Sequence, residues 1–163
     1  MAKLQQEIQM TKPFATPRQE AFLGLQRTAD LAARPIEKVF ARHKLTPEQY
    51  NVLRILRGAE PEGLPTLVIG RRMITRASNV TRIIDRLEVK GLLIRRREPS
   101  DRRVVRIRIS PAGLTLLGRM QASVDGTTER AMAGLSPKEA ERLNLLLEKI
   151  RAGLPTPFTV GEP

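Results

Sequence analysis

The most regular pattern of apolar and polar positions lies between Thr75 and Gly91. Apolar residues recur there at the helical spacing i, i+3, i+4, i+7, and they are Val80, Ile83, Ile84 and Leu87. At about 100° per residue this spacing gathers them into one stripe, which predicts a short helix with one buried face. Thr75 is suited to be its N-cap, and Gly91 to follow its C-terminus in a left-handed conformation.

Polar residues fall on a separate face of this predicted helix, and they are Thr75, Ser78, Asn79, Arg82 and Arg86. No apolar side chain competes for this face, so it is available to contact a partner. Short polar side chains in the first turn of such a helix, followed by arginines, are residue types that reach base edges in the DNA major groove.

After Gly91 the apolar period changes from 3.6 to 2. In residues 103–109, Val105, Ile107 and Ile109 share one side, whereas Arg106 and Arg108 share the other. This pattern is typical of a half-buried β-strand. Residues 98–102 contain turn-forming residues and begin a basic pair, so they predict the loop of a hairpin. The first strand carries Arg95, Arg96 and Arg97. Because neighbouring side chains alternate, at most two of these face a nucleic acid.

Two helices are predicted before this region. Residues 18–44 carry apolar side chains at steps of three and four, which indicates a long amphipathic helix. Pro35 lies inside it and predicts a bend or a break. The sequence Thr46-Pro47-Glu48-Gln49 is a capping box that begins a second helix, which ends near Gly58.

A helix-turn-helix is predicted next. Residues 65–73 suit one short helix, and Ile74 with Thr75 forms a tight connection to the helix that follows. Gly70 permits the two helices to approach closely but weakens the first by about 1 kcal/mol. A short helix, a second helix with an exposed polar face and a basic hairpin together form a winged helix-turn-helix.

Two more amphipathic helices follow, one beginning at Ser110-Pro111 and the other at the capping box Ser136–Glu139. The predicted fold class is therefore mainly α with a small β-hairpin. The chain divides into a flexible N-terminal arm (1–17), a dimerisation helix (18–44), a winged helix-turn-helix DNA-binding domain (45–109), C-terminal dimerisation helices (110–153) and an irregular tail (154–163).

The terminal helices carry more apolar surface than a small winged domain can bury. We therefore expect a homodimer in which the terminal helices of two subunits interlock. A two-fold dimer places two recognition helices about 34 Å apart, one turn of B-DNA, and predicts an operator that is an inverted repeat. The alternative is a monomer with a small helical bundle.

Positive charge is concentrated in the same region as the helix-turn-helix. Residues 71–108 hold thirteen Lys and Arg against four Asp and Glu, so they contribute +9 of the net charge of +12. This concentration on a helix and an adjacent hairpin favours double-stranded DNA as the partner, with the helix in the major groove and the loop near the backbone or minor groove. The alternative is a solvated basic surface.

The same residues resemble the MarR family (multiple antibiotic resistance regulators). The resemblance rests on the run from Thr75 that contains Leu-Glu-Val-Lys-Gly91-Leu, on the wing motif Asp101-Arg-Arg103, and on Ser110-Pro-Ala-Gly113. It extends from about residue 22 to residue 152. It implies a winged helix-turn-helix regulator, a homodimer, and repression as the usual mode of action.

Roles can be assigned on the predicted DNA surface, which comprises Thr75, Arg76, Ser78, Asn79, Arg82, Arg86, Arg97, Asp101, Arg102 and Arg103. Arg82 is the best candidate for a guanine contact, because a guanidinium can donate to two acceptors of one base. Arg86 is as well placed to hold a phosphate. The family resemblance implies that Arg103, with Arg102, reaches the minor groove and that Asp101 orients an arginine or shapes the turn. Asp101 is equally well explained as a turn residue.

The family resemblance also implies control by a small molecule, often an aromatic acid or a hydrophobic toxin, bound between the dimer helices and the winged domain. The residues that suit such a site are Phe40, Arg42, His43 and Tyr50. A structural alternative exists for each part of this set. Aromatic residues at helical spacing are more often core, and a lone histidine near a helix end is more often a capping or surface residue.

Other functions are disfavoured by what the sequence lacks. Cys is absent and His43 is the sole histidine, which argues against disulfides, zinc clusters and Cys/His catalysis. We found no nucleophile with a base, no carboxylate pair and no phosphate-binding glycine loop, so neither an enzyme nor a cofactor is expected. A sequence-independent nucleic-acid binder remains the alternative, although residues 71–108 contain no aromatic residue for base stacking. No apolar run suits a signal peptide or a membrane span, so the expected location is cytoplasmic.

Overall fold

The computed structural model describes residues 3–75, 77, 79–97 and 105–155. Within these residues the elements in chain order are α1 (Lys3–Glu7), α2 (Pro17–Arg42), α3 (Pro47–Arg57), α4 (Thr66–Arg72), α5 (Val80–Val89), β1 (Leu93–Arg97), β2 (Val105–Ile109), α6 (Pro111–Met132) and α7 (Pro137–Ala152). The predicted fold class, mainly α with one small hairpin, is confirmed. Across the described part of the chain, no helix has both the length and the apolar composition needed to span a membrane.

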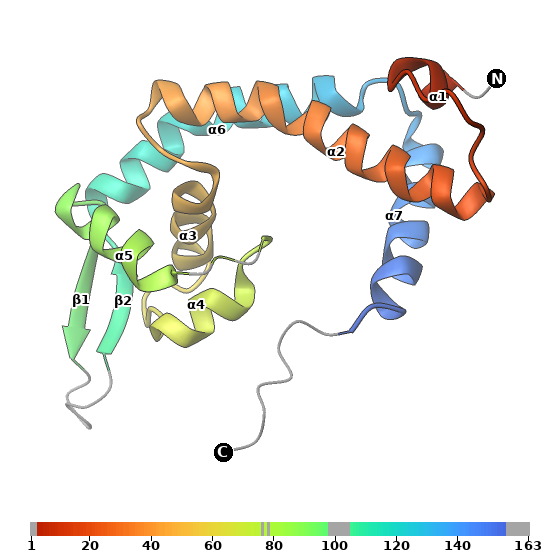
Figure 1. Ribbon diagram of the computed structural model, residues 1–163. Coiled ribbons are helices and arrows are strands. Elements are labelled where there is room, and N and C mark those ends of the chain that lie inside the picture. The colour runs from red at the N-terminus through yellow and green to blue at the C-terminus, as the bar shows by residue number, and fades with distance from the viewer. Residues whose placement is uncertain (1–2, 76, 78, 98–104, 156–163) are drawn as a thin grey trace.

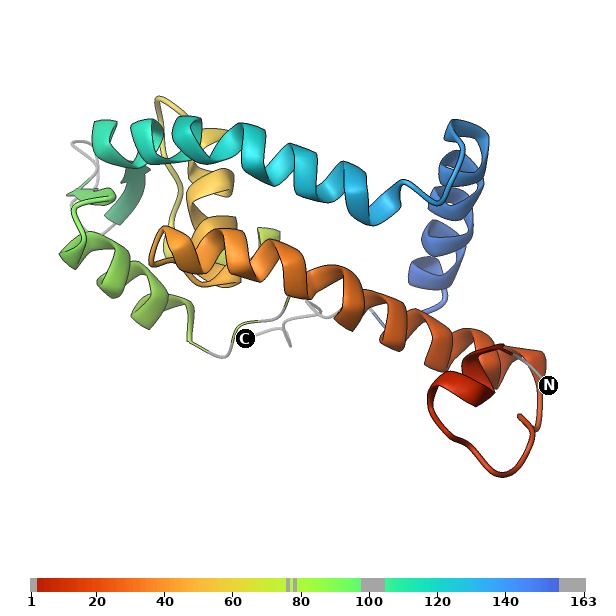
Figure 2. The same cartoon turned by 90° about the horizontal axis from the view of Figure 1, so that it is seen from above.

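The two long helices α2 and α6 lie along one edge of the molecule, and the short elements gather beside one end of them (Figure 1). There, α3, α4, α5 and the hairpin form the compact unit that the sequence predicted as a winged helix-turn-helix. Viewed from above, α7 lies at the opposite end of α6, and α1 lies beside the start of α2 (Figure 2). The chain therefore has one compact unit at one end and helices extending away from it at the other.

A single apolar cluster holds this unit together. Its fully buried large residues come from every element of the unit and from α6, and they are Val52, Leu53, Leu56, Ile69, Ile84, Leu87, Leu93, Ile107, Leu117 and Met120. Burial of each such side chain stabilises the fold by about 1.5–3 kcal/mol. Because α3 contributes three of them, it is the central helix against which α5, α6 and the hairpin pack.

Helix caps follow the sequence closely. The Thr46 hydroxyl accepts the Gln49 N–H at 3.2 Å, and the Gln49 side chain accepts the Thr46 N–H, so the predicted capping box is formed. Ser136 and Glu139 form the second one. The hydrogen bond from the Ser136 hydroxyl to the Glu139 carboxylate, together with the one from the Ser136 backbone N–H, lowers the pKa of Glu139.

The hairpin meets α6 at a tight junction. Its strands pair antiparallel with Leu93 opposite Ile109. The Ser110 hydroxyl caps α6 by accepting the Gly113 N–H at 3.1 Å and donates to the Gly91 carbonyl at 2.6 Å. Gly91 itself has φ +67°, the left-handed conformation predicted for it. A Cβ on Gly113 would lie only 2.3 Å from the Leu92 carbonyl oxygen, so the Ser-x-x-Gly motif reflects close packing of helix on hairpin.

The terminal helices leave apolar side chains uncovered. No residue of α7 is buried, and Leu145, Leu146 and Ile150 are 49–66% exposed. On α2, Phe22 and Leu25 are also exposed. Exposed apolar side chains on such helices indicate that a second surface covers them. This agrees with the excess apolar surface noted in the sequence.

Two details of the N-terminal region add to the sequence interpretation. The segment 1–17, expected to be an arm, contains the short helix α1, and the buried Gln5 donates a hydrogen bond to the Met10 carbonyl at 3.2 Å. Pro35 was predicted to bend or break the helix, and it does not break it, because α2 continues through this residue.

Candidate nucleic-acid interface

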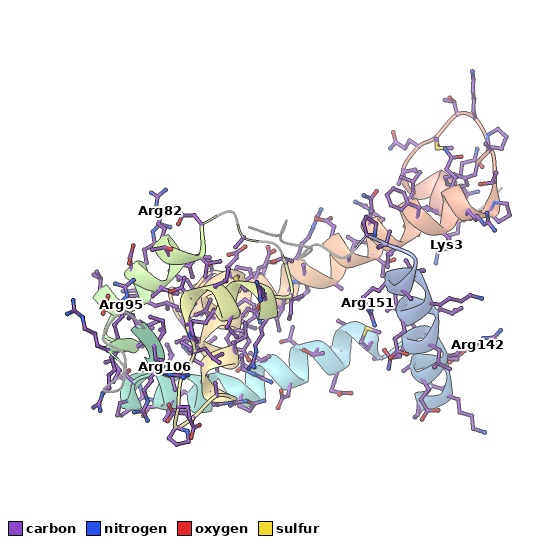
Figure 3. All side chains as sticks on the ribbon, turned by 90° about the horizontal axis from the view of Figure 1, so that it is seen from below. Lys3, Arg82, Arg95, Arg106, Arg142 and Arg151 are labelled. Carbon is purple, nitrogen blue, oxygen red and sulfur yellow. The ribbon has the colours of Figure 1, made fainter. Side chains whose placement is uncertain are left out.

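The centre of the candidate interface is α5, which packs against α3 and α4. Its predicted apolar stripe faces the core: Ile84 and Leu87 are fully buried, and Val80 and Ile83 are partly buried against the same cluster. A Cβ on Gly70 of α4 would lie 3.3 Å from a methyl group of Val80, which confirms the close approach expected at Gly70. The opposite face of α5 is exposed, and Figure 3 shows Arg82 pointing away from the molecule.

The start of α5 differs from the prediction. Thr75 was predicted as the N-cap, which is wrong: the helix begins at Val80, and the Asn79 side chain accepts the Arg82 N–H at 2.9 Å. The chain before it is held elsewhere, because the Ile74 N–H donates to the Asn51 side-chain oxygen at 2.9 Å. The apolar stripe starts only at Val80, and both Thr75 and Asn79 are good capping types. The pattern alone could not choose between them.

Asn79→Ala should weaken the fold through loss of this cap. The Arg82 N–H would lose its acceptor, and N-cap losses cost about 1 kcal/mol. Urea unfolding of the two proteins at equal concentration measures the difference. Asn79→Asp, which keeps an acceptor oxygen, is the matched control and should retain the stability. Equal destabilisation by both variants would show that the cap does not stabilise α5.

The later start of α5 changes where the predicted residues lie. Thr75 is exposed in the connection between α4 and α5 rather than on the helix. Asn79 lies at the helix start, with its side-chain oxygen used by the cap. Arg82 and Arg86 lie on the exposed face of α5, one turn apart. Arg76 and Ser78 fall outside the described residues.

One arginine of the first strand joins the hairpin to α5. Arg95 forms an ion pair with Asp85, and its Nη1 donates to the Glu88 carboxylate at 2.5 Å. Its guanidinium therefore pairs with both acidic groups of α5 and is engaged within the protein. The sequence analysis allowed at most two phosphate contacts among the three consecutive arginines, and the structure engages Arg95 internally.

The strand register creates a basic face that the sequence interpretation missed. Arg96 lies opposite Arg106, and Ile94 lies opposite Arg108. Arg96, Arg106 and Arg108 therefore share one face of the hairpin, although the Arg106 Nη1 also donates to the Gly63 carbonyl at 3.4 Å. The alternation of the second strand was visible in the sequence, but the pairing that adds Arg96 depends on the register.

Of the other wing residues predicted to contact DNA, one lies within the described residues and three lie outside them. Arg97 is exposed at the end of β1, opposite Val105, on the same side of the hairpin as Arg95. Asp101, Arg102 and Arg103 lie outside the described residues, so their predicted roles stay predictions.

A lysine joins the end of α5 to the end of the long helix. The Lys90 ammonium donates to the Lys44 carbonyl at 2.5 Å and to the Gln49 side-chain oxygen at 3.2 Å. Lys44 belongs to the connection between α2 and α3, and Gln49 to the first turn of α3. The C-terminal end of α5 is therefore attached to the point where the long helix meets the compact unit.

The structure does not place the four residues predicted for a small-molecule site around one pocket. A pocket of about 420 Å³ lies among α2, α3, α6 and the connection after α4, and Phe40 and Tyr50 both line it. Their rings stack with centroids 4.4 Å apart, and the Tyr50 hydroxyl accepts a hydrogen bond from Arg54 at 3.3 Å. Both aromatic residues also belong to the apolar core. Arg42 lines a different pocket, and His43 lines neither of these two.

Comparison with known proteins identifies this arrangement. The family model described as MarR family matches residues 45–105. The HTH-type transcriptional regulator YkoM of Bacillus subtilis, itself uncharacterised, is 35% identical over 66% of this chain and 68% of its own length. The regulator PecS of Dickeya dadantii is 30% identical over 80% of this chain and 79% of its own. The crystal structure of a MarR transcription factor from Planctomyces limnophilus is 40% identical, with a TM-score of 0.65, over 83% of this chain and 98% of that one.

The chain belongs to the MarR family. Members of this family are transcriptional regulators, and this chain is one of them by both sequence and fold. The compact unit of α3 to β2 matches the winged helix-turn-helix of MarR structures, and α5 lies where the sequence predicts the recognition helix.

Three further proteins are similar to this chain in sequence or in fold. The homoprotocatechuate degradative operon repressor of Escherichia coli is 29% identical over 81% of this chain and 86% of its own. The structure of BpsR from Bordetella bronchiseptica, whose DNA binding is regulated by 6-hydroxynicotinic acid, is 26% identical with a TM-score of 0.73, over 86% of this chain and 98% of that one. The MepR–DNA complex from Staphylococcus aureus has the same TM-score at 21% identity, over 82% and 97% of the two chains, and shows the shared fold.

Proposed function

We propose that this MarR protein is a homodimeric repressor that binds an inverted-repeat operator and is released from it by a small aromatic or hydrophobic ligand. One observation supports the DNA-binding part most directly: Arg82 and Arg86 are exposed on α5 beside a hairpin whose Arg96 and Arg97 are also exposed. These positive side chains lie on the elements that enter a major groove and contact the backbone in winged domains.

This assembly follows the domain division predicted from the sequence. Residues 45–109 bind DNA, and the helices of residues 18–44 and 110–153 dimerise, while the arm (1–17) and the tail (154–163) flank them. The exposed apolar side chains of α2 and α7 supply the surface that a second copy would bury. Two-fold symmetry then presents two recognition helices to an operator with the same symmetry.

The MarR relatives support repression as the mode of action, because the Escherichia coli protein is an operon repressor. A sequence-independent nucleic-acid-binding protein is disfavoured by the same family membership. A transcriptional regulator acts on the chromosome, so we expect this protein in the cytoplasm.

Arg82→Ala should reduce operator affinity and relax sequence preference. Arg82 suits a guanine contact because its side chain is exposed and its guanidinium can donate two parallel hydrogen bonds. The expected cost is about 1–3 kcal/mol. Fluorescence anisotropy with the operator, and with operator variants in which the contacted guanine is replaced, measures this loss of affinity. Arg119→Ala, an exposed arginine on α6, is the matched control and should bind as the parent does. Unchanged binding by Arg82→Ala would reject the assigned face of α5.

The effector site is best placed at the pocket lined by Phe40 and Tyr50. The stacked rings supply an apolar wall, and Arg54, with its guanidinium carbon 6.0 Å from the Tyr50 ring centroid, supplies a cation suited to a carboxylate. BpsR, which responds to an aromatic acid, shares this fold. Because the pocket lies between long helices and the compact unit, a ligand there can change the separation of the two recognition helices.

The deciding experiment is fluorescence anisotropy with DNA from immediately upstream of the protein's own gene, competed by random duplex at several salt concentrations. Affinity at least about a thousandfold higher for the upstream DNA is expected of a sequence-specific regulator. Titration of aromatic acids into that complex then tests release. Equal affinity for both DNAs would contradict autoregulation and favour a distant operator or a nonspecific role.

A further inference from the structure

A second pocket lies between the two long helices, and half of its lining residues are cations. It has a volume of about 410 Å³, and its walls include Arg34, Lys38 and Arg42 of α2 and Arg130 of α6. The remaining lining residues are neutral, and no Asp or Glu is among them. This pocket is distinct from the one lined by Phe40 and Tyr50, with which it shares no lining residue.

The three α2 cations recur at steps of four along that helix, so they form one stripe. Asp30 accepts a hydrogen bond from Arg34 at 2.5 Å on the exposed surface. Arg130 donates to the neutral Thr127 hydroxyl at 3.0 Å. The positive charge around the pocket is therefore only partly offset by the protein.

DNA recognition does not account for this charge. The recognition helix and the hairpin are at one side of the compact unit, whereas α2 and α6 lie along another edge of the molecule (Figure 1). None of the pocket residues belongs to α4, α5 or the hairpin. Cations gathered around one hollow repel one another unless an anion lies among them.

We propose that this pocket binds a small anion with at least two negative charges, carried by phosphate or carboxylate groups. All of the four cations except Lys38 are arginines, and guanidinium groups match both anions through paired hydrogen bonds. A single negative charge would leave most of the cluster unbalanced. The apolar walls at Pro35, Val39 and Ala131 accommodate a short carbon skeleton.

The consequence of binding is a stronger connection between α2 and α6. The anion is attracted by side chains of both helices at once, so it replaces their mutual repulsion with attraction. Because it binds the folded chain, it also raises thermal stability by mass action. A metabolite with this chemistry would act on the long helices independently of the aromatic pocket.

Isothermal titration calorimetry of the full chain at constant ionic strength tests the proposal, with pyrophosphate and citrate as the probes. Comparison of the two distinguishes a preference for phosphate from one for carboxylate. We expect saturable binding of one probe molecule per chain. The double variant Lys38→Gln/Arg130→Gln should bind at least about tenfold more weakly, as expected for loss of two charge-assisted contacts. Arg130→Lys, which keeps the charge but not the paired hydrogen bonds, should weaken binding less than the double variant does.

Two matched variants separate the pocket from the rest of the basic surface. Arg82→Gln removes a cation from the recognition helix, and Arg119→Gln removes one from the exposed surface of α6. Both should bind the probes as the parent does. If neither probe binds saturably, or if these controls weaken binding as much as the double variant, the proposal is wrong. Operator binding is measured separately, so its outcome does not decide this test.

Discussion

Leu146→Asp/Ile150→Asp should convert the protein to a monomer and lower its operator affinity by more than about a hundredfold. Both side chains are about half exposed on α7, at i and i+4, and belong to a helix without a single buried residue. A carboxylate at each position would have to be desolvated in a dimer interface, which is strongly unfavourable. A monomer engages one half-site and loses the avidity of simultaneous binding, a factor of about 10²–10⁴.

Sedimentation equilibrium and operator anisotropy on the same samples measure this prediction. Asn144→Asp is the matched control, because it places a carboxylate on the opposite side of the same helix. It should remain dimeric and bind DNA normally. A double variant that stays dimeric would show that α7 does not form the interface.

Gly113→Ala should destabilise the fold by about 3 kcal/mol, near the upper end for adding one carbon to a packed site. The new Cβ would lie 2.3 Å from the Leu92 carbonyl oxygen and 2.7 Å from Cγ1 of Ile109. A side-chain rotation cannot relieve the first clash, because its partner is backbone. The hairpin would have to move away from α6, and this movement would disrupt the hydrogen bonds of the Ser110 hydroxyl to Gly91 and Gly113.

Gly118→Ala in the same helix supplies the contrast. A Cβ added at Gly118 would have no atom within 4 Å outside its own stretch of helix, so the substitution should stabilise α6 by about 0.5–1 kcal/mol through helix propensity. Urea unfolding at a fixed chain concentration compares the two variants. Similar free energies of unfolding for both would show that the packing of α6 on the hairpin tolerates a methyl group.

The fold was largely predictable because local patterns and tertiary packing agree. The stripe of α5, the capping boxes at Thr46 and Ser136 and the left-handed Gly91 each depend on residues close in sequence. The start of α5 was predicted wrongly because the local sequence, on which the prediction depended, allows two positions for it. Two acceptable caps, Thr75 and Asn79, precede one stripe, and the choice between them depends on a distant hydrogen bond to Asn51.

The candidate site was less predictable where it depends on pairing between elements. The sequence showed three consecutive arginines but not that Arg95 would be held by two acidic residues of α5. It placed Arg42 with the aromatic residues, whereas the helical turn of α2 directs it into the other pocket. The ion pairs of Arg95 join two elements, so spacing along the strand could not reveal them. The separation of Arg42 from Phe40, two residues apart on one helix, follows from the helical period, which the sequence interpretation did not apply there.

The Lys90 link has a thermodynamic consequence for control by small molecules. It attaches the C-terminal end of the recognition helix to the Lys44 carbonyl, at the connection between the long helix and the winged domain. This link offers a route by which a change in the angle of the long helix reaches the recognition helix. Coupling of this kind is reciprocal. Any ligand that lowers operator affinity by a given factor must itself bind the operator-bound dimer more weakly by that same factor, so occupied operators protect themselves from low effector concentrations.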